Sequence, residues 1–166
     1  MVVSAPSTVW QSDITYIEVS GQFYYAVFII DVYTKKIVGY AVSDHMRAIA
    51  NIKALKMALK SHPPPIIHHS DRGSQYGYKK YVQLLIDNNS KISMCKSGQD
   101  NAYAERINRT IKEEYLDHWN PKTFSKLRVD IKKAVINYNQ KRLHNHLPNM
   151  RPVEFEKEYY SGNIKM

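Results

Sequence analysis

The chain has 166 residues, the length of one ordinary domain, and 43% of them are hydrophobic, which excludes a chain too polar to fold. Its 24 Lys and Arg against 15 Asp and Glu give a net charge of +9, which favours a polyanionic partner such as nucleic acid. The single cysteine, Cys95, excludes an internal disulfide, and neither a membrane-spanning run nor a signal-peptide pattern is present, so we expect a cytoplasmic protein.

The first three elements in the chain are expected to be strands. Residues 10–19, 22–31 and 37–43 are rich in β-branched and aromatic side chains. Short connections between them predict antiparallel hairpins. The continuous apolar run 26–30 indicates a strand that is buried on both faces, as the central strand of a sheet is.

The rest of the chain alternates between helix and strand. Apolar residues at helical spacing predict the helices, and prolines or polar clusters end them. In chain order we expect a helix at about 48–60, a strand at 66–70, a helix marked by Tyr78, Val82 and Leu85, a strand at 91–94, a helix at about 102–117 and a long helix capped by Thr123. The segment 148–166 is expected to be a tail that packs across the body or frays. This order predicts an α/β fold with a mixed five-stranded sheet, its first three strands antiparallel, and helices on both faces.

Three carboxylates lie where such a fold exposes functional groups. Asp13 is on the first strand, Asp71 follows the fourth strand, and Glu105 is in the first turns of a helix. If they meet at one edge of the sheet, they could hold Mg²⁺, which prefers a few carboxylates and keeps the remaining positions for water or phosphate. Two such ions about 4 Å apart would clamp the attacking and leaving oxygens of a phosphoryl transfer. Each acid taken alone is more often a solvated surface charge.

Four ordered motifs surround these acids. They are WQSDIT at residues 10–15, HSDRGSQY at 69–76, Ser93-Met94 with Asp100-Asn101-Ala102, Glu105 and Lys112–Glu114, and Tyr138-Asn139 with Arg142, His144, Pro152 and Glu154-Phe155. Together they resemble the DDE subunit of bacterial insertion-sequence transposases, which are related to retroviral integrases. The resemblance covers about residues 9–155, nearly the whole chain.

The resemblance implies a ribonuclease-H-like fold in which Asp13, Asp71 and Glu105 form the catalytic and metal-binding triad. It also implies Mg²⁺ or Mn²⁺ as cofactor, with two ions per site when DNA is bound, and an enzyme that acts on DNA at the nucleoid as a homodimer or higher multimer. The interval between Asp71 and Glu105 holds 33 residues, two fewer than is usual in similar transposases. No helix-turn-helix pattern precedes Trp10, so we expect one catalytic core domain, 1–166, without a recognition region.

The helix that carries Glu105 predicts DNA contacts. At about 100° per residue, Glu105, Arg109 and Lys112 share one stripe, while Ala104, Ile107, Ile111 and Tyr115 form the face that must be buried. Arg109 and Lys112 could hold phosphates beside the reacting one, as basic residues do in similar enzymes. The alternative is an ordinary salt-bridged surface.

Loop residues around the acids are further candidates for DNA contacts. We predict Arg72, Gln75 and Asn101 in this role, although Asn101 has the chemistry of a helix N-cap as well. His68 and His69 are adjacent on a strand and must point to opposite faces, so we expect one in the core and one near the site, without a zinc ion.

The function expected from these motifs is DNA transposition. A divalent-metal-dependent transposase would cleave a 3′ end and transfer that strand to a target. Two alternatives remain open at this point: a nuclease of the same fold that cleaves without joining, and an inactive DNA-binding remnant of a transposase.

Overall fold

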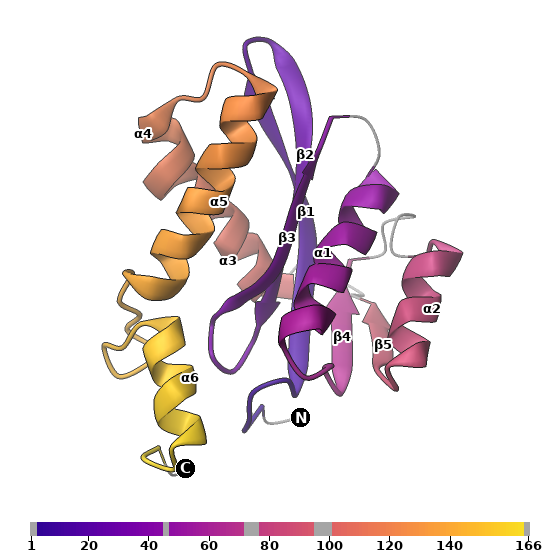
Figure 1. Cartoon of the computed structure of the whole chain (residues 1–166), viewed down its shortest axis with the longest axis vertical. Coiled ribbons are helices and arrows are strands. Elements are labelled where there is room, and N and C mark those ends of the chain that lie inside the picture. Colours follow the sequence, from indigo (N-terminus) through magenta and orange to yellow (C-terminus); the bar gives the residue numbers. More distant parts are fainter. Residues whose placement is uncertain (1–2, 45–46, 72–76, 95–100, 165–166) are drawn as a thin grey trace.

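A mixed sheet of five strands forms the centre of the molecule (Figure 1). This computed structural model describes residues 3–44, 47–71, 77–94 and 101–164. The strands are β1 (Val9–Val19), β2 (Gln22–Asp31), β3 (Ile37–Ser43), β4 (Ile67–Ser70) and β5 (Lys91–Met94), in the order β3-β2-β1-β4-β5. β1, β2 and β3 pair antiparallel, and β4 runs parallel to both β1 and β5. The predicted mixed sheet is confirmed.

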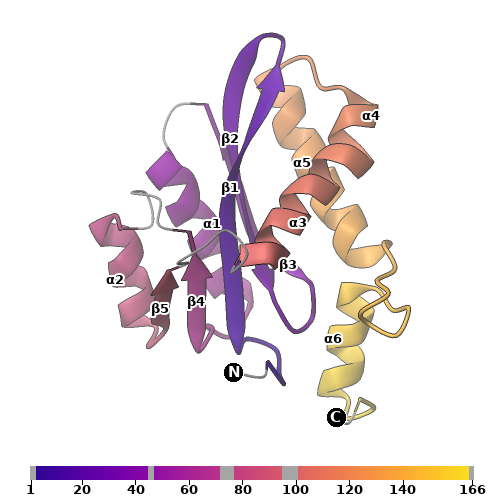
Figure 2. The ribbon, with the colours of Figure 1, turned by 180° about the vertical axis from the view of Figure 1, so that it is seen from behind.

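Helices cover both faces of this sheet, as the sequence predicts (Figures 1 and 2). One apolar core joins the sheet to α1 (Arg47–Ser61) and α2 (Lys79–Asp87). The other core joins it to α3 (Ala102–Ile111), the π-helical segment η2 (Lys112–Leu116) and α5 (Phe124–Gln140), with the short α4 (Asp117–Trp119) between them. No helix in the described parts of the chain is both long and apolar enough to cross a membrane.

The hairpin of β1 and β2 has the features that the sequence predicts. Ser20 and Gly21 both have positive φ, 51° and 80°, which suits a tight turn between twisted strands. β2 lies between β1 and β3, and its second half is buried throughout. The Thr123 side chain accepts a hydrogen bond from the Lys126 amide at 3.1 Å, which confirms the predicted cap of α5.

The buried sides of α1 and α2 are not simply their largest apolar residues. In α1 the buried side is made of small residues, Ala50, Ala54 and Ala58, around Leu55, whereas Ile49 is 38% exposed. The reason is a close approach to β3: a Cβ on Gly39 would overlap the carbonyl oxygen of Ala54. Small side chains on the helix and no side chain on the strand let the two backbones approach. In α2 the buried pair is Tyr81 and Leu85, and Tyr78 is 45% exposed.

Two further features were not predicted. The helix expected over 102–117 changes from α to π geometry at Lys112, which inserts an extra residue into that turn. The tail contains a helix, α6 (Pro152–Tyr160), with Pro152 in its first turn. Phe155 of α6 packs with Tyr33 and Leu147 in a third apolar cluster, so this part of the tail is docked on the body.

Substitution of Gly39 tests the approach of α1 to β3. Gly39→Ala should lower the free energy of unfolding by about 1–3 kcal/mol, because the new methyl group must push the backbone of Ala54 away. Urea denaturation measures this change. Lys56→Ala, on the exposed side of α1, should alter the stability by less than about 0.5 kcal/mol. Equal stabilities for the two variants would contradict the close packing.

Candidate active site

Two of the three predicted acids occupy matching positions on neighbouring strands. β1 and β4 run parallel, and their register ends at the pair Ser12 and Ser70. The next residues are Asp13, still on β1, and Asp71, the first residue beyond β4. Both aspartates are half-buried. The parallel pairing therefore brings together two residues that are far apart in the sequence.

Both aspartates lie on the α3 side of the sheet. Side chains alternate between the faces of a strand, and Ser12 faces α2, where it hydrogen bonds with the Tyr81 hydroxyl. His68 is on the same side as Ser12, since the Tyr81 hydroxyl lies 2.9 Å from its Nε2. Asp13 must then point to the other face, which α3 covers, and alternation gives Asp71 the same direction.

α3 lies beside β1 (Figure 2). Three amide side chains attach the two elements to each other. Oε1 of Gln11 accepts hydrogen bonds from the backbone N–H groups of Tyr103 (3.1 Å) and Ala104 (3.4 Å), which are free at the start of a helix. Nδ2 of Asn101 donates to the carbonyl oxygen of Ser12 at 3.0 Å. Nδ2 of Asn108 donates to Oδ2 of Asp13 at 2.8 Å. We call Gln11, Asn101 and Asn108 the amide clamp.

The amide clamp changes the interpretation of Asn101. The sequence suggested either a helix cap or a DNA contact. Asn101 is at the N-cap position of α3, but its side chain makes no capping hydrogen bond, so the capping prediction is wrong. The cap comes instead from Gln11 on β1. Asn101 is only 2% exposed, and its side chain serves the contact with β1.

Burial and neighbouring charges perturb Asp13. Desolvation, the charge of Asp71 and the charge of Glu105 together raise its pKa to about 6, although hydrogen bonds from the Ile14 amide and Asn108 oppose the shift. The charges of both other acids therefore act on Asp13. Repulsion of this kind is relieved by a dication, so the all-oxygen donor set suits Mg²⁺ or Mn²⁺.

The outer surface of α3 carries the predicted basic stripe. Glu105 and Arg109 are exposed and Lys112 is half-buried, while Ala104, Ile107 and Ile111 are buried as expected. Burial lowers the pKa of Lys112, and the charges of Asp117 and Asp13 oppose this shift. Asn108, which hydrogen bonds to Asp13, stands one helical turn before Lys112, so Lys112 lies on the flank of the helix that faces Asp13.

The acids do not form a single compact ligand cage. Among the residues that the structure describes, no three His, Cys, Asp or Glu side chains are close enough to hold one ion. Asp13 and Asp71 are brought together by the sheet, and Glu105 approaches from the helix. Arg72 and Gln75, the other predicted DNA contacts, lie outside the described residues.

The two histidines of β4 follow the predicted alternation. His68 is buried, and burial together with the charge of His69 lowers its pKa to about 3. His69 is half-buried on the side of the acids, with Nδ1 at 2.9 Å from the Ser93 hydroxyl.

Sequence reasoning missed the roles of Gln11 and Asn108. Gln11 stands in the first motif and Asn108 one helical turn after Glu105, but their partners are about 90 residues away.

The sequence matches two family profiles, both described as Integrase core domain, over residues 3–100 and 89–152. An uncharacterized 31 kDa protein of insertion element IS600 from Shigella sonnei is 38% identical over 95% of this chain and 60% of its own length. The transposase for IS629 from Shigella sonnei is 36% identical over 97% of this chain and 55% of its own length. The transposase for IS904 from Lactococcus lactis is 35% identical over 93% of this chain and 63% of its own length. The chain thus spans 55–63% of the length of these relatives.

Solved structures share the fold at low sequence identity. The HTLV-2 integrase catalytic core domain, in a dimeric form with magnesium, has a TM-score of 0.75 at 18% identity, over 91% of this chain and 97% of its own. The BIV integrase catalytic core has a TM-score of 0.67 at 15% identity, over 96% of this chain and 99% of its own. These similarities confirm the predicted ribonuclease-H-like fold.

The amide clamp makes a prediction about stability. Gln11→Ala should lower the free energy of unfolding by about 1–2 kcal/mol, because two backbone donors at the start of α3 lose their acceptor in a buried position. The measurement is urea denaturation. Gln83→Ala serves as the control, since Gln83 is exposed on α2 and bonds only Asp87. A Gln11→Ala protein as stable as the control would mean that α3 is held by its apolar face alone.

Proposed function

The chain belongs to the integrase core domain family, and from that premise we propose that it is the catalytic core of a transposase, spanning residues 1–166. Its reaction is the cleavage of DNA to expose a 3′ hydroxyl and the attack of that hydroxyl on a target phosphodiester, which joins the strands and displaces a 3′ oxygen of the target. One observation supports this most: Asp13 on β1 and Asp71 just beyond β4 directly follow the paired residues Ser12 and Ser70 of two parallel strands, and both Asp71 and Glu105 raise the pKa of Asp13.

In this proposal Asp13, Asp71 and Glu105 hold Mg²⁺ or Mn²⁺. When bound, the ions polarise the phosphate and lower the pKa of water or of the attacking hydroxyl. The pKa of Asp13 is raised by burial and by the charges of both other acids, so a cation held by these carboxylates would relieve that unfavourable burial and repulsion.

Other residues of the site position the reactants. Asn108 donates to Oδ2 of Asp13 and so fixes the orientation of this carboxylate. Arg109 and Lys112 stand on the same stripe as Glu105, where they would grip phosphates that flank the reacting one. Holding the phosphodiester in line with its attacking oxygen supplies most of the catalysis, and no covalent protein–DNA intermediate is needed.

The whole enzyme is proposed to act as a homodimer or higher multimer at the bacterial nucleoid. Transposition joins two DNA ends to one target, so two catalytic cores must be brought together. The net charge of +9 suits close approach to DNA, whose phosphates dominate non-specific affinity. Sedimentation with and without DNA measures the assembly.

A branched DNA substrate tests the reaction itself. Such a substrate carries a 3′ hydroxyl already next to a junction phosphodiester, so its resolution into a joined strand reports phosphoryl transfer without recognition of an element end. We expect joined product in the presence of Mn²⁺ or Mg²⁺. Cleavage without any joined product would favour a nuclease of the same fold, and neither product would favour a DNA-binding remnant.

The acids are tested in that assay. Asp13→Asn, Asp71→Asn and Glu105→Gln should each reduce product formation at least about tenfold, a barrier increase of about 1.4 kcal/mol or more, because each removes a charged metal ligand. Glu113→Gln is the matched control, since Glu113 is an exposed acid further along the same helical run. A triad variant that keeps the activity of Glu113→Gln would remove that acid from the assignment.

Metal removal separates catalysis from folding. Treatment with a chelator should abolish activity, because the acids would lose the metal ion. The far-ultraviolet circular dichroism spectrum should stay unchanged, because apolar clusters, and not the three acids, form the core of the protein. Mg²⁺ or Mn²⁺ should restore the activity, and Zn²⁺ should not be required. Unfolding on chelation would point to a structural metal instead.

The basic stripe is tested by salt titration of DNA binding. Arg109→Ala and Lys112→Ala should weaken binding to all sequences alike and flatten the plot of log affinity against log salt by about one unit per lost phosphate contact. Lys53→Ala, exposed on α1 across the sheet, is the control and should keep the wild-type slope. If the stripe variants lose thermal stability at unchanged affinity, the two side chains are structural.

A further inference from the structure

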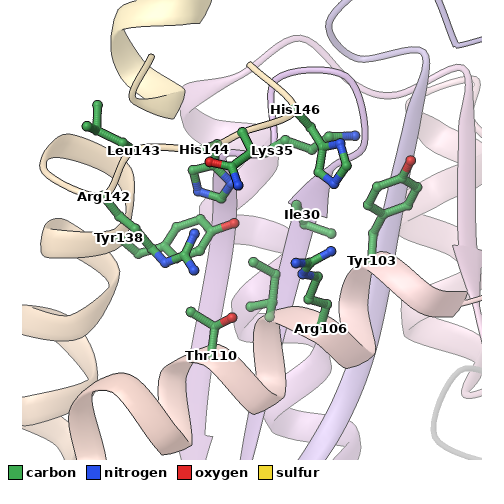
Figure 3. A pocket seen from close by; sticks show the side chains of 12 residues that line it. Ile30, Lys35, Tyr103, Arg106, Thr110, Tyr138, Arg142, Leu143, His144 and His146 are labelled. Atoms are coloured by element: carbon green, nitrogen blue, oxygen red, sulfur yellow. The ribbon is translucent and has the colours of Figure 1, made fainter. Parts of the chain in front are cut away.

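A second cationic site lies on the other flank of α3. Figure 3 shows a pocket between α3, the turn that follows β2 and the loop that follows α5, with a volume of about 140 Å³. Lys35 comes from the turn, Tyr103 and Arg106 from α3, and Arg142 and His144 from the loop. None of these residues belongs to the proposed triad or to the basic stripe.

The side chains of this pocket create a positive field. Burial and the charges of Arg142, Arg106 and Lys35 lower the pKa of His144 to about 4, and only the charge of Glu114 opposes them. Three cations thus act on one imidazole, which stays neutral at pH 7. One of the three is compensated: Arg142 makes a bidentate ion pair with Glu114, with Nε–Oε2 at 2.7 Å and Nη2–Oε1 at 2.6 Å.

The other two cations differ in what they contact. Nζ of Lys35 donates to the carbonyl oxygen of Val32 and lies 3.9 Å from the centre of the Tyr103 ring. The guanidinium of Arg106 makes no hydrogen bond or ion pair with any residue in the described part of the chain, and the side chain is exposed. A guanidinium is a fork of donors that matches phosphate oxygens. The pocket therefore offers one uncommitted phosphate-binding group in a net positive setting.

The position of Arg106 on α3 connects the pocket to the acids. At about 100° per residue, the exposed surface of the helix passes from Lys112 through Glu105 and Arg109 to Arg106. Tyr103, 39% exposed, comes next on the same surface and offers an aromatic ring to a sugar or base. A DNA strand that leaves the acids across α3 meets these side chains in turn.

We propose that this pocket holds a backbone phosphodiester of the bound DNA, gripped by Arg106 with Lys35 beside it. This inference rests on the proposed function, because it assigns a second contact to the same substrate. The ligand chemistry is a phosphate oxygen pair, and the source is the DNA strand rather than free phosphate. Free phosphate could reach the same guanidinium, so the experiment includes both.

The first measurement is the salt dependence of binding to a branched duplex. Arg106→Gln should weaken binding about fivefold at 0.15 M salt and lower the slope of log affinity against log salt by about one unit. Arg128→Gln removes the same charge from an exposed site on α5, outside this pocket, and should leave the slope unchanged. Equal slopes for wild type and Arg106→Gln would overturn the proposal.

The second measurement follows the Arg106 Nε–Hε signal by nuclear magnetic resonance in the complete chain. The signal should shift when the duplex is added, and the shift should persist in the Glu105→Gln variant, in which the triad is broken. A shift with millimolar inorganic phosphate but none with DNA would make this a free-anion site and overturn the DNA assignment. DNA binding by wild type without any effect at Arg106 would overturn this inference alone, whereas failure of wild type to bind DNA would overturn the proposed function with it.

Discussion

The attachment of α3 to β1 through the amide clamp is the constraint on which the candidate site depends. Glu105 is exposed, and no packing of its own side chain fixes its place. Its position is set by its neighbours in the helix, because Ala104 is bonded to Gln11 and Asn108 to Asp13. Amides suit this task, since they donate and accept hydrogen bonds next to carboxylates without adding a charge. The amide clamp therefore fixes α3 next to Asp13 and leaves the negative charge of the carboxylates unneutralised.

The two flanks of α3 face clusters of opposite charge, carboxylates on one flank and cations on the other. On the flank of Asp13, carboxylates repel one another, and burial makes the repulsion stronger. On the flank of Arg106, cations gather with Glu114 as the acid that opposes them at His144. Glu114, in the π-helical segment that begins at Lys112, is the acid that pairs with Arg142. Phosphodiesters and divalent cations together would neutralise both flanks at once.

The sequence predicts much of this arrangement and misses its non-local parts. The five strands and the long α5 follow from side-chain periodicity and local caps, and the structure has them within a residue or two. Periodicity predicts the buried face of α3 for the same reason. The helix α6 was not predicted within the tail, although Pro152 stands in its first turn, where proline is favoured. The cap from Gln11 could not be predicted, because its two partners are 92 and 93 residues away and no local pattern encodes them.

The long sequence separation between the partners of the amide clamp determines when the site can form during folding. The contacts of the amide clamp span 89 to 95 residues, and Asp71 reaches Asp13 only through the crossover that ends in β4. Pairings of such long range must overcome a large loop-closure entropy, so they form late in folding. During synthesis, the ribosome releases β1 long before α3 exists. A nascent or prematurely ended chain that lacks α3 therefore carries two of the acids but cannot assemble the third beside them.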